Sequence, residues 1–166
     1  IHPQLAAKMG ASLDRISGGR FSINVVNGWY PKEVDVFGNG TWLDRTEERY
    51  SRMGEFMQVL RGLWCEESFD FDGDHFRLED AVLPIKTLQT PNPPIYAASS
   101  AKQGMEQVAR YADVWFVGYE PGLDNAPGNM ERIARNVEHM RALSERFGRT
   151  LRFGISAHVI CTETRK

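Results

Sequence analysis

The chain has 166 residues, which suits one compact domain and is too short for a complete eight-fold α/β barrel of about 250 residues. Its 42% hydrophobic and 25% charged residues are typical of a globular protein and exclude disorder as the main state. The formal net charge is −2 and no run of basic residues occurs, so we expect no nucleic-acid partner.

Membrane, secretion and metal signals are weak in this sequence. No apolar stretch approaches the roughly 20 residues of a membrane-spanning helix, and residues 1–10 do not resemble a signal peptide. We therefore expect a cytoplasmic protein without membrane contact. Cys65 and Cys161 have no second Cys or His at metal-ligand spacing, so we expect two buried thiols and no metal site.

The first predicted elements are a helix, a strand and a longer helix. Apolar residues recur at helical spacing from Leu5 through Met9 and Leu13 to Ile16, and the following Ser-Gly-Gly is typical of a helix end. Residues 21–26 form an uncharged, β-branched run that predicts a buried strand, and residues 27–31 predict a loop without regular structure. A helical apolar stripe then extends over residues 45–64.

The second half of the chain alternates between strands and helices after an insertion. Residues 69–76 alternate around an Asp-Gly turn and predict a hairpin, which together with a proline-rich connector fills the segment from Glu67 to Pro94. Strands are predicted at 95–98, 114–118 and 152–161, with helices between them. This alternation predicts an α/β fold with about four parallel strands, either a small open sheet or a piece of a barrel.

Polar residues near the strand ends are candidates for a site, because α/β folds bind ligands beyond the carboxyl ends of their strands. Asn24 lies inside an apolar strand, and Ser99 and Ser100 precede a helix whose free N–H groups suit a phosphate. Arg49 and Tyr50 combine a fixed positive charge with a flat ring. Ordinary roles compete with each reading: a backbone-bonded amide, a helix cap and a solvated arginine.

His158 is the candidate for proton transfer. It alternates with apolar neighbours in the last predicted strand, where a neutral imidazole can exchange protons near neutral pH, although a core histidine with satisfied hydrogen bonds explains it equally well. No phosphate-binding loop, dinucleotide fingerprint or nucleophile elbow occurs, which argues against acyl transfer and nucleotide hydrolysis.

Several stretches together resemble the bacterial-luciferase-like flavin monooxygenases. The most specific are LDRISGGRF at residues 13–21 and NVVNGW at residues 24–29. Shorter stretches follow in the family's order, at residues 48–50, 69–73, 93–96, 111–113 and 152–155. The similarity covers nearly the whole chain and is greatest to the branch of alkanesulfonate, dimethyl sulfone and pyrimidine-ring monooxygenases.

This resemblance implies a TIM-type (β/α)8 barrel, of which residues 1–166 would be one domain from the central to the C-terminal part. It also implies reduced FMN supplied by a separate NAD(P)H-dependent flavin reductase, molecular oxygen as co-substrate, and a small organic substrate. A deazaflavin-dependent oxidoreductase of the same superfamily and a non-catalytic flavin-binding or assembly module are the alternatives.

The resemblance also assigns roles to residues. Asn24, Glu33, Arg49 and Tyr50 occupy positions of flavin contacts, and Ser99 or Ser100 occupies the position of a phosphate-binding serine.

A further position bears on the substrate. His158 corresponds to a histidine near the active site of alkanesulfonate monooxygenases, where an arginine stands two residues earlier, whereas this chain has Ser156. The substitution argues against a sulfonate and favours a neutral sulfone or heterocycle, because arginine would bind such an anion in bidentate fashion.

Half of a barrel would also leave two strand edges unpaired. The inner faces of Asn24, Val26 and Val117 would then lack opposing layers. We therefore expect residues 1–166 to be inactive as a lone chain, and either to form a homo-oligomer or to derive from a longer chain.

Overall fold

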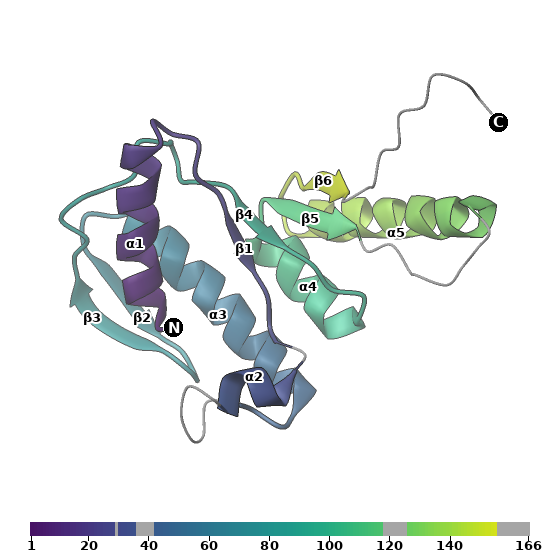
Figure 1. Ribbon diagram of the computed structural model, residues 1–166, viewed down its shortest axis with the longest axis horizontal. Coiled ribbons are helices and arrows are strands. Elements are labelled where there is room, and N and C mark those ends of the chain that lie inside the picture. Colours follow the sequence, from purple (N-terminus) through teal and green to yellow (C-terminus); the bar gives the residue numbers. More distant parts are fainter. Residues whose placement is uncertain (29, 36–41, 118–125, 156–166) are drawn as a thin grey trace.

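The structure, a computed structural model, describes residues 1–28, 30–35, 42–117 and 126–155 (Figure 1). The elements in chain order are α1 (Pro3–Ile16), β1 (Ile23–Val25), α2 (Pro31–Asp35), α3 (Thr46–Cys65), β2 (Phe69–Asp72), β3 (Arg77–Ala81), β4 (Ile95–Ala97), α4 (Lys102–Tyr111), β5 (Val114–Val117), α5 (Ala126–Arg146) and β6 (Arg152–Ile155). Strands and long helices alternate as predicted.

Four strands form one parallel sheet in the order β1-β4-β5-β6. Asn24 pairs with Tyr96, Tyr96 with Val114, and Val114 with Arg152, so all four carboxyl ends lie at the same edge. The predicted α/β fold with four parallel strands is confirmed. The predicted hairpin is also present, as the separate antiparallel pair β2 and β3, which lies beyond α1 and α3 in Figure 1.

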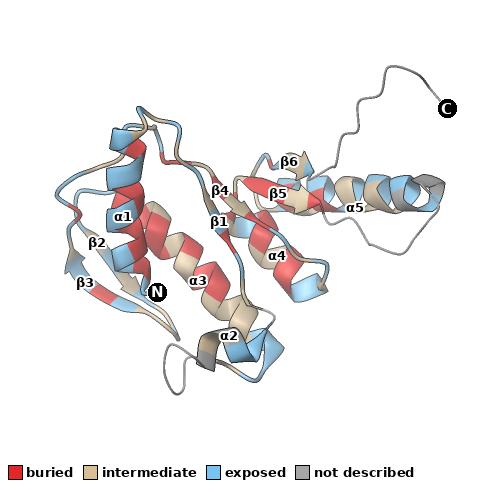
Figure 2. Cartoon of the chain, in the orientation of Figure 1, coloured by how far each residue is buried: buried red, intermediate tan, exposed pale blue. Residues whose placement is uncertain are grey.

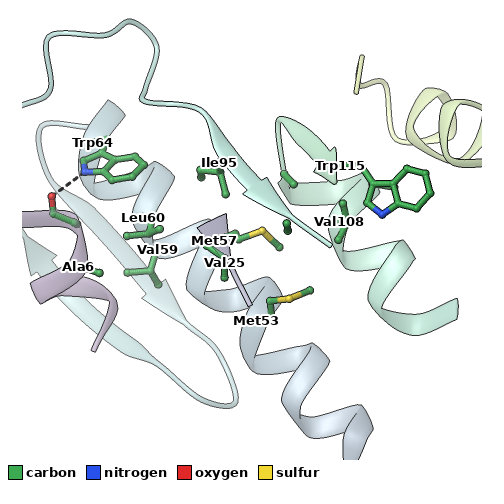
Figure 3. Close-up of a cluster of buried hydrophobic side chains, with 14 of the residues drawn as sticks. Ala6, Val25, Met53, Met57, Val59, Leu60, Trp64, Ile95, Val108 and Trp115 are labelled. Carbon is green, nitrogen blue, oxygen red and sulfur yellow. Dashed lines mark hydrogen bonds between the residues drawn. The ribbon is translucent and has the colours of Figure 1, made fainter. Parts of the chain in front are cut away.

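Helices α3 and α4 cover one face of the sheet. Figure 3 shows the core between α3, the strands and α4, in which Met57, Leu60 and Ile95 are fully buried. Side chains alternate along a strand, so Val117 shares the buried face of Trp115. The expectation that Val117 lies on the inner face of a barrel is therefore wrong.

The opposite face of the sheet carries polar and aromatic side chains. Asn24 is exposed in the middle of β1. The rings of Tyr96 and Phe116 lie 5.5 Å apart on the neighbouring strands, and both are half-buried. In a barrel, this face is the one that lines the interior.

Helix α1 buries its small residues and exposes its large ones. Leu5, Met9, Leu13 and Ile16 are between 47% and 83% exposed, so the helix predicted from their spacing is present and these residues lie on its exposed side. Figure 2 shows that α1 has one buried and one exposed side. The buried side includes the small residues Ala6, Ala7, Gly10 and Ala11. Small side chains let α1 approach α3 closely, and the Trp64 indole N–H of α3 donates to the Ala7 carbonyl at 2.9 Å (Figure 3).

A buried carboxylate ties α1 to the proline-rich connector. Asp14 is fully buried and accepts hydrogen bonds from the Leu88 N–H at 2.7 Å, the Gln89 N–H at 2.9 Å and the Gln89 side-chain amide at 2.7 Å. Burial alone would raise the pKa of Asp14, but the hydrogen bonds from Gln89 and Leu88 outweigh it and lower the pKa. Asp14 therefore has a structural role.

A second carboxylate anchors the hairpin to α3. Glu55 is 8% exposed, and its two oxygens accept backbone N–H groups from Asp74, His75 and Phe76 at 2.9 to 3.0 Å. These N–H groups belong to the turn between β2 and β3. The hairpin is thus held at its tip by the middle of α3.

An ion-pair network closes the amino-terminal edge of the sheet. Asp113, directly before β5, accepts from Arg61 at 2.8 Å, Arg149 at 3.2 Å, the Ile95 N–H at 3.0 Å and Asn92 at 3.3 Å. Burial would raise the pKa of Asp113, but the bonds from Arg61 and Ile95 lower it. The network joins α3 to the starts of β4 and β5 and to the segment before β6.

Two local expectations differ from the structure. The loop predicted at residues 27–31 ends one residue early, because Pro31 begins the short helix α2. Cys65 is exposed rather than buried, because it ends α3 at the surface, while Cys161 lies outside the described residues. Within the described ranges, no helix is long and apolar enough to cross a membrane.

Candidate functional site

The candidate site lies at the carboxyl edge of the sheet, opposite the Asp113 network. The segment after β4 leads into the start of α4, and the chain after β1 leads through α2 toward the start of α3. In parallel α/β folds this edge is where ligands bind.

Tyr50, Ser99 and Gly104 meet at this edge. The Ser99 hydroxyl lies 3.3 Å from the Tyr50 hydroxyl, which joins the first turns of α3 to the segment before α4. A Cβ built on Gly104 would overlap both the Ser99 hydroxyl and the Tyr50 ring. Glycine is therefore the residue that lets these two hydroxyl-bearing side chains approach the first turn of α4.

The start of α4 has no side-chain cap. Its N-cap is Ala101, so the prediction that Ser99 or Ser100 caps this helix is wrong by one or two residues. The Ser99 hydroxyl instead accepts the Ala101 N–H at 3.2 Å, and the Trp115 indole donates to the Ser99 carbonyl at 3.3 Å. Uncapped N–H groups at a helix start, beside two hydroxyls, form a site suited to a phosphate.

Arg49 is held at the start of α3. Its Nη1 donates to the carbonyls of Leu43 at 2.5 Å and Asp44 at 3.0 Å, and its Nη2 donates to the Thr46 hydroxyl at 2.9 Å. Its Cζ lies 4.5 Å from the centroid of the Trp42 ring. Its Nε is buried and has no hydrogen-bond partner.

A second arginine strengthens the positive charge near this position. Burial lowers the pKa of Arg52, and the positive charge of Arg49 lowers it further. The two guanidinium groups are therefore close enough to interact electrostatically.

For the remaining predicted site residues, the structure gives fewer contacts or none. Asn24 is exposed on the inner face of β1, and Ser100 is exposed beside Ser99. Glu33 lies in α2, of which only the backbone is described at this position. His158 lies outside the described residues.

The structure thus brings together Tyr50 and Ser99 from separate parts of the chain. Sequence reasoning missed Gly104 and Trp42, which contact predicted site residues through space. A glycine in the first turn of a helix is unfavourable and was an available signal for Gly104. An aromatic residue shortly before a helix is common, so Trp42 gave none.

A cavity of about 470 Å³ lies elsewhere, between α1 and the segment after β3. It is mostly apolar and is lined by Gln4, Lys8, Ser12, Leu63 and residues 81–85. It contains none of the predicted site residues, so we place the candidate site at the sheet edge and not in this cavity. Across the described ranges, no cluster of His, Cys, Asp and Glu could hold a metal ion.

Comparison with known proteins identifies relatives over nearly the whole chain. A family model described as luciferase-like monooxygenase matches residues 1–166. The FMNH2-dependent dimethylsulfone monooxygenase of Pseudomonas putida is 36% identical over 163 residues, which make up 98% of this chain and 42% of that protein. The chain therefore spans less than half the length of this relative.

Solved structures share the fold. A monooxygenase from Streptomyces bottropensis superposes with a TM-score of 0.72 at 23% identity, over 93% of this chain and 45% of that one. An F420-dependent secondary alcohol dehydrogenase, solved with an F420-acetone adduct, superposes with a TM-score of 0.65 at 24% identity, over 92% of this chain and 44% of that one. The four-stranded sheet is accordingly part of the barrel that luciferase-like proteins share.

Proposed function

Because the chain belongs to the family of luciferase-like monooxygenases, we propose that the protein uses reduced FMN and molecular oxygen to oxygenate a small organic substrate. One oxygen atom would enter the substrate and the other would leave as water. The FMNH2 dependence of the Pseudomonas putida relative, at 36% identity, supports this cofactor.

The observation that carries the proposal is the contact of Tyr50 and Ser99 over Gly104 at the uncapped start of α4. Two hydroxyls, free backbone N–H groups and a surface without a Cβ fit the phosphate of FMN. We assign the phosphate contact to Ser99 rather than Ser100, because Ser99 is half-buried beside Tyr50 while Ser100 faces outward.

Arg49 contributes the fixed positive charge of the proposed site. Its buried, unpartnered Nε is a donor that an anionic ligand would satisfy. The exposed Asn24 on β1 would contact the flavin ring from the inner face of the sheet, and Glu33 on α2 would add a further flavin contact. When bound, reduced FMN supplies the electrons for oxygen activation, while these residues bind and orient it.

The substrate and partners complete the proposal. A neutral sulfone or heterocycle fits better than a sulfonate, since Ser156 stands where an arginine would bind the anion. We assign proton transfer near the substrate to His158. A separate NAD(P)H-dependent reductase would supply FMNH2 in the cytoplasm, and copies of the chain would associate.

The test of this function is a comparison of two cofactors. Anaerobic titrations with reduced FMN and with reduced deazaflavin measure binding, and an oxygen electrode with a flavin reductase and dimethyl sulfone measures turnover. We expect tight FMNH2 binding and oxygen uptake that rises with the sulfone. Deazaflavin binding without oxygen use would establish the hydride-transfer alternative, and FMNH2 binding without oxygenated product would establish the non-catalytic one.

Two neighbouring serines give a matched test of the phosphate site. Ser99→Ala removes a hydroxyl beside Tyr50, so FMN affinity should fall about tenfold or more if a charge-assisted hydrogen bond is lost. Ser100→Ala removes an exposed hydroxyl and should leave the affinity unchanged. Equal effects of the two substitutions, measured by flavin fluorescence titration, would show that the site is assigned wrongly.

A further inference from the structure

We propose that Trp42 is a positioning residue, which holds the Arg49 guanidinium by stacking on its face so that Arg49 Nε stays available to the FMN phosphate. This inference rests on the proposed function, because it assumes that Arg49 contacts FMN. It adds a residue that the sequence motifs did not single out.

Three kinds of contact fix the Arg49 guanidinium. The Trp42 ring covers its face, with 4.5 Å between Cζ and the ring centroid. Two backbone carbonyls, of Leu43 and Asp44, accept from Nη1, and the Thr46 hydroxyl accepts from Nη2. A face contact and edge contacts together determine both the plane of the group and its rotation within that plane.

The fixed orientation leaves one donor in an unusual state. Arg49 Nε is buried and unpartnered, and a buried donor without an acceptor destabilises a protein. Among the described residues, the partners of this guanidinium are carbonyls, a hydroxyl and an indole, and none is a carboxylate. Within the part of the chain that the structure describes, no carboxylate therefore pairs with its charge, which suits a residue that binds an anion.

Trp42 is itself held by the loop after β1. A Cβ on Gly28 would lie 3.3 Å from the Trp42 ring, and Gly28 has a φ of +79°, which favours glycine. The indole thus lies between the end of β1 and the start of α3. Because both segments lead to the candidate site, Trp42 connects the strand that carries Asn24 with the helix that carries Arg49.

The test compares FMN with riboflavin, which lacks the phosphate. In Trp42→Leu, loss of the stacking contact should weaken FMN binding about five- to thirty-fold and leave riboflavin binding unchanged. Trp42→Phe keeps an aromatic face and should restore most of the FMN affinity. In an Arg49→Ala background, Trp42→Leu should have no further effect, because its action requires the guanidinium.

The outcomes separate this inference from the proposed function. If the wild-type protein bound FMN no better than riboflavin, the phosphate site itself would be refuted, and this inference with it. If wild-type binding favoured FMN but Trp42→Leu weakened both flavins equally, or neither, only the positioning role would be refuted. Unfolding midpoints of each variant identify any that fails to fold. If Trp42→Leu fails, Trp42→Met, which is large and apolar but has no aromatic face, takes its place in the same comparison.

Discussion

Replacing Asp113 by Asn should destabilise the fold strongly while leaving the candidate site intact. The substitution removes the negative charge between Arg61 and Arg149, whose guanidinium groups lie 2.8 and 3.2 Å from the same carboxylate oxygen. The two arginines would then face each other without a counterion. The Asn side chain would also place N–H donors where the Asp113 carboxylate only accepts hydrogen bonds.

The magnitude follows from burial and from the number of bonds. The side chains of Asp113, Arg61 and Arg149 are 21%, 27% and 26% exposed, so water screens the pair only in part. Breaking a fully buried pair costs about 3–5 kcal/mol, and exposed pairs contribute about 0–1 kcal/mol. We expect a loss of about 2–4 kcal/mol in the free energy of unfolding at pH 7.

The pH dependence has a defined sign. The pKa of Asp113 is lowered in the folded state, so its contribution to stability is fully present above the ordinary carboxyl pKa of 3.8. It is lost as the pH falls through the lower, folded pKa. The stability difference between wild type and Asp113→Asn should therefore be constant near pH 6 to 7 and shrink below about pH 4.

Urea denaturation measures this difference, and a surface pair supplies the control. Asp72 pairs with Arg77 at 3.4 Å, but the two side chains are 77% and 79% exposed, so Asp72→Asn should change stability by less than about 0.5 kcal/mol. FMN affinity at pH 7 should be unaffected by either substitution. Equal destabilisation by the two substitutions, or a difference that persists unchanged to pH 3, would refute the assigned role of Asp113.

Two further predictions concern the site and the core. Gly104→Ala places a methyl group against Ser99 and Tyr50 and should lower FMN affinity about tenfold. Gly128→Ala, at a position with open space around the added methyl group, should leave the affinity unchanged. If fluorescence titrations gave the two variants the same FMN affinity, the proposed phosphate site at Gly104 would be contradicted. Ile16→Ser, at a position 83% exposed, should change the stability of this chain by less than about 0.5 kcal/mol, while Leu60→Ala in the core should cost about 2–5 kcal/mol. Calorimetric unfolding that ranks the two in the reverse order would show that the buried face of α1 is assigned wrongly.

The sequence predicted which elements form better than how they face one another. Helical spacing located α1 correctly, but it did not show that the Leu5 and Leu13 side is the exposed one. The packing instead depends on how closely two helix axes can approach, and Ala7 and Gly10 permit an approach that large side chains prevent. The distance between two helix axes depends on the side chains of both helices, so the spacing of apolar residues in one helix does not predict it.

In the candidate site too, some residues were predictable from the sequence and others were not. Ser99 and Tyr50 were predicted from a resemblance to a family, and their contact is present in the structure. Gly104 contacts Tyr50 from a segment distant in sequence, and Trp42 contacts Arg49 and Gly28 across loops, which residue types and spacing do not reveal. Asp14 belongs to the most specific family stretch, yet its carboxylate holds the connector and does not face the site.

The two edges of the sheet have different roles, one in stability and one in the proposed ligand binding. Asp113 fastens the strand starts to α3 at one edge, and the residues proposed to bind FMN occupy the other. Loops on the second edge can therefore change in length or sequence without loosening the strand register. Those loops could therefore be randomised in a search for new substrates. The variants should still fold, provided that Asp113 and its ion pairs at the opposite edge are kept.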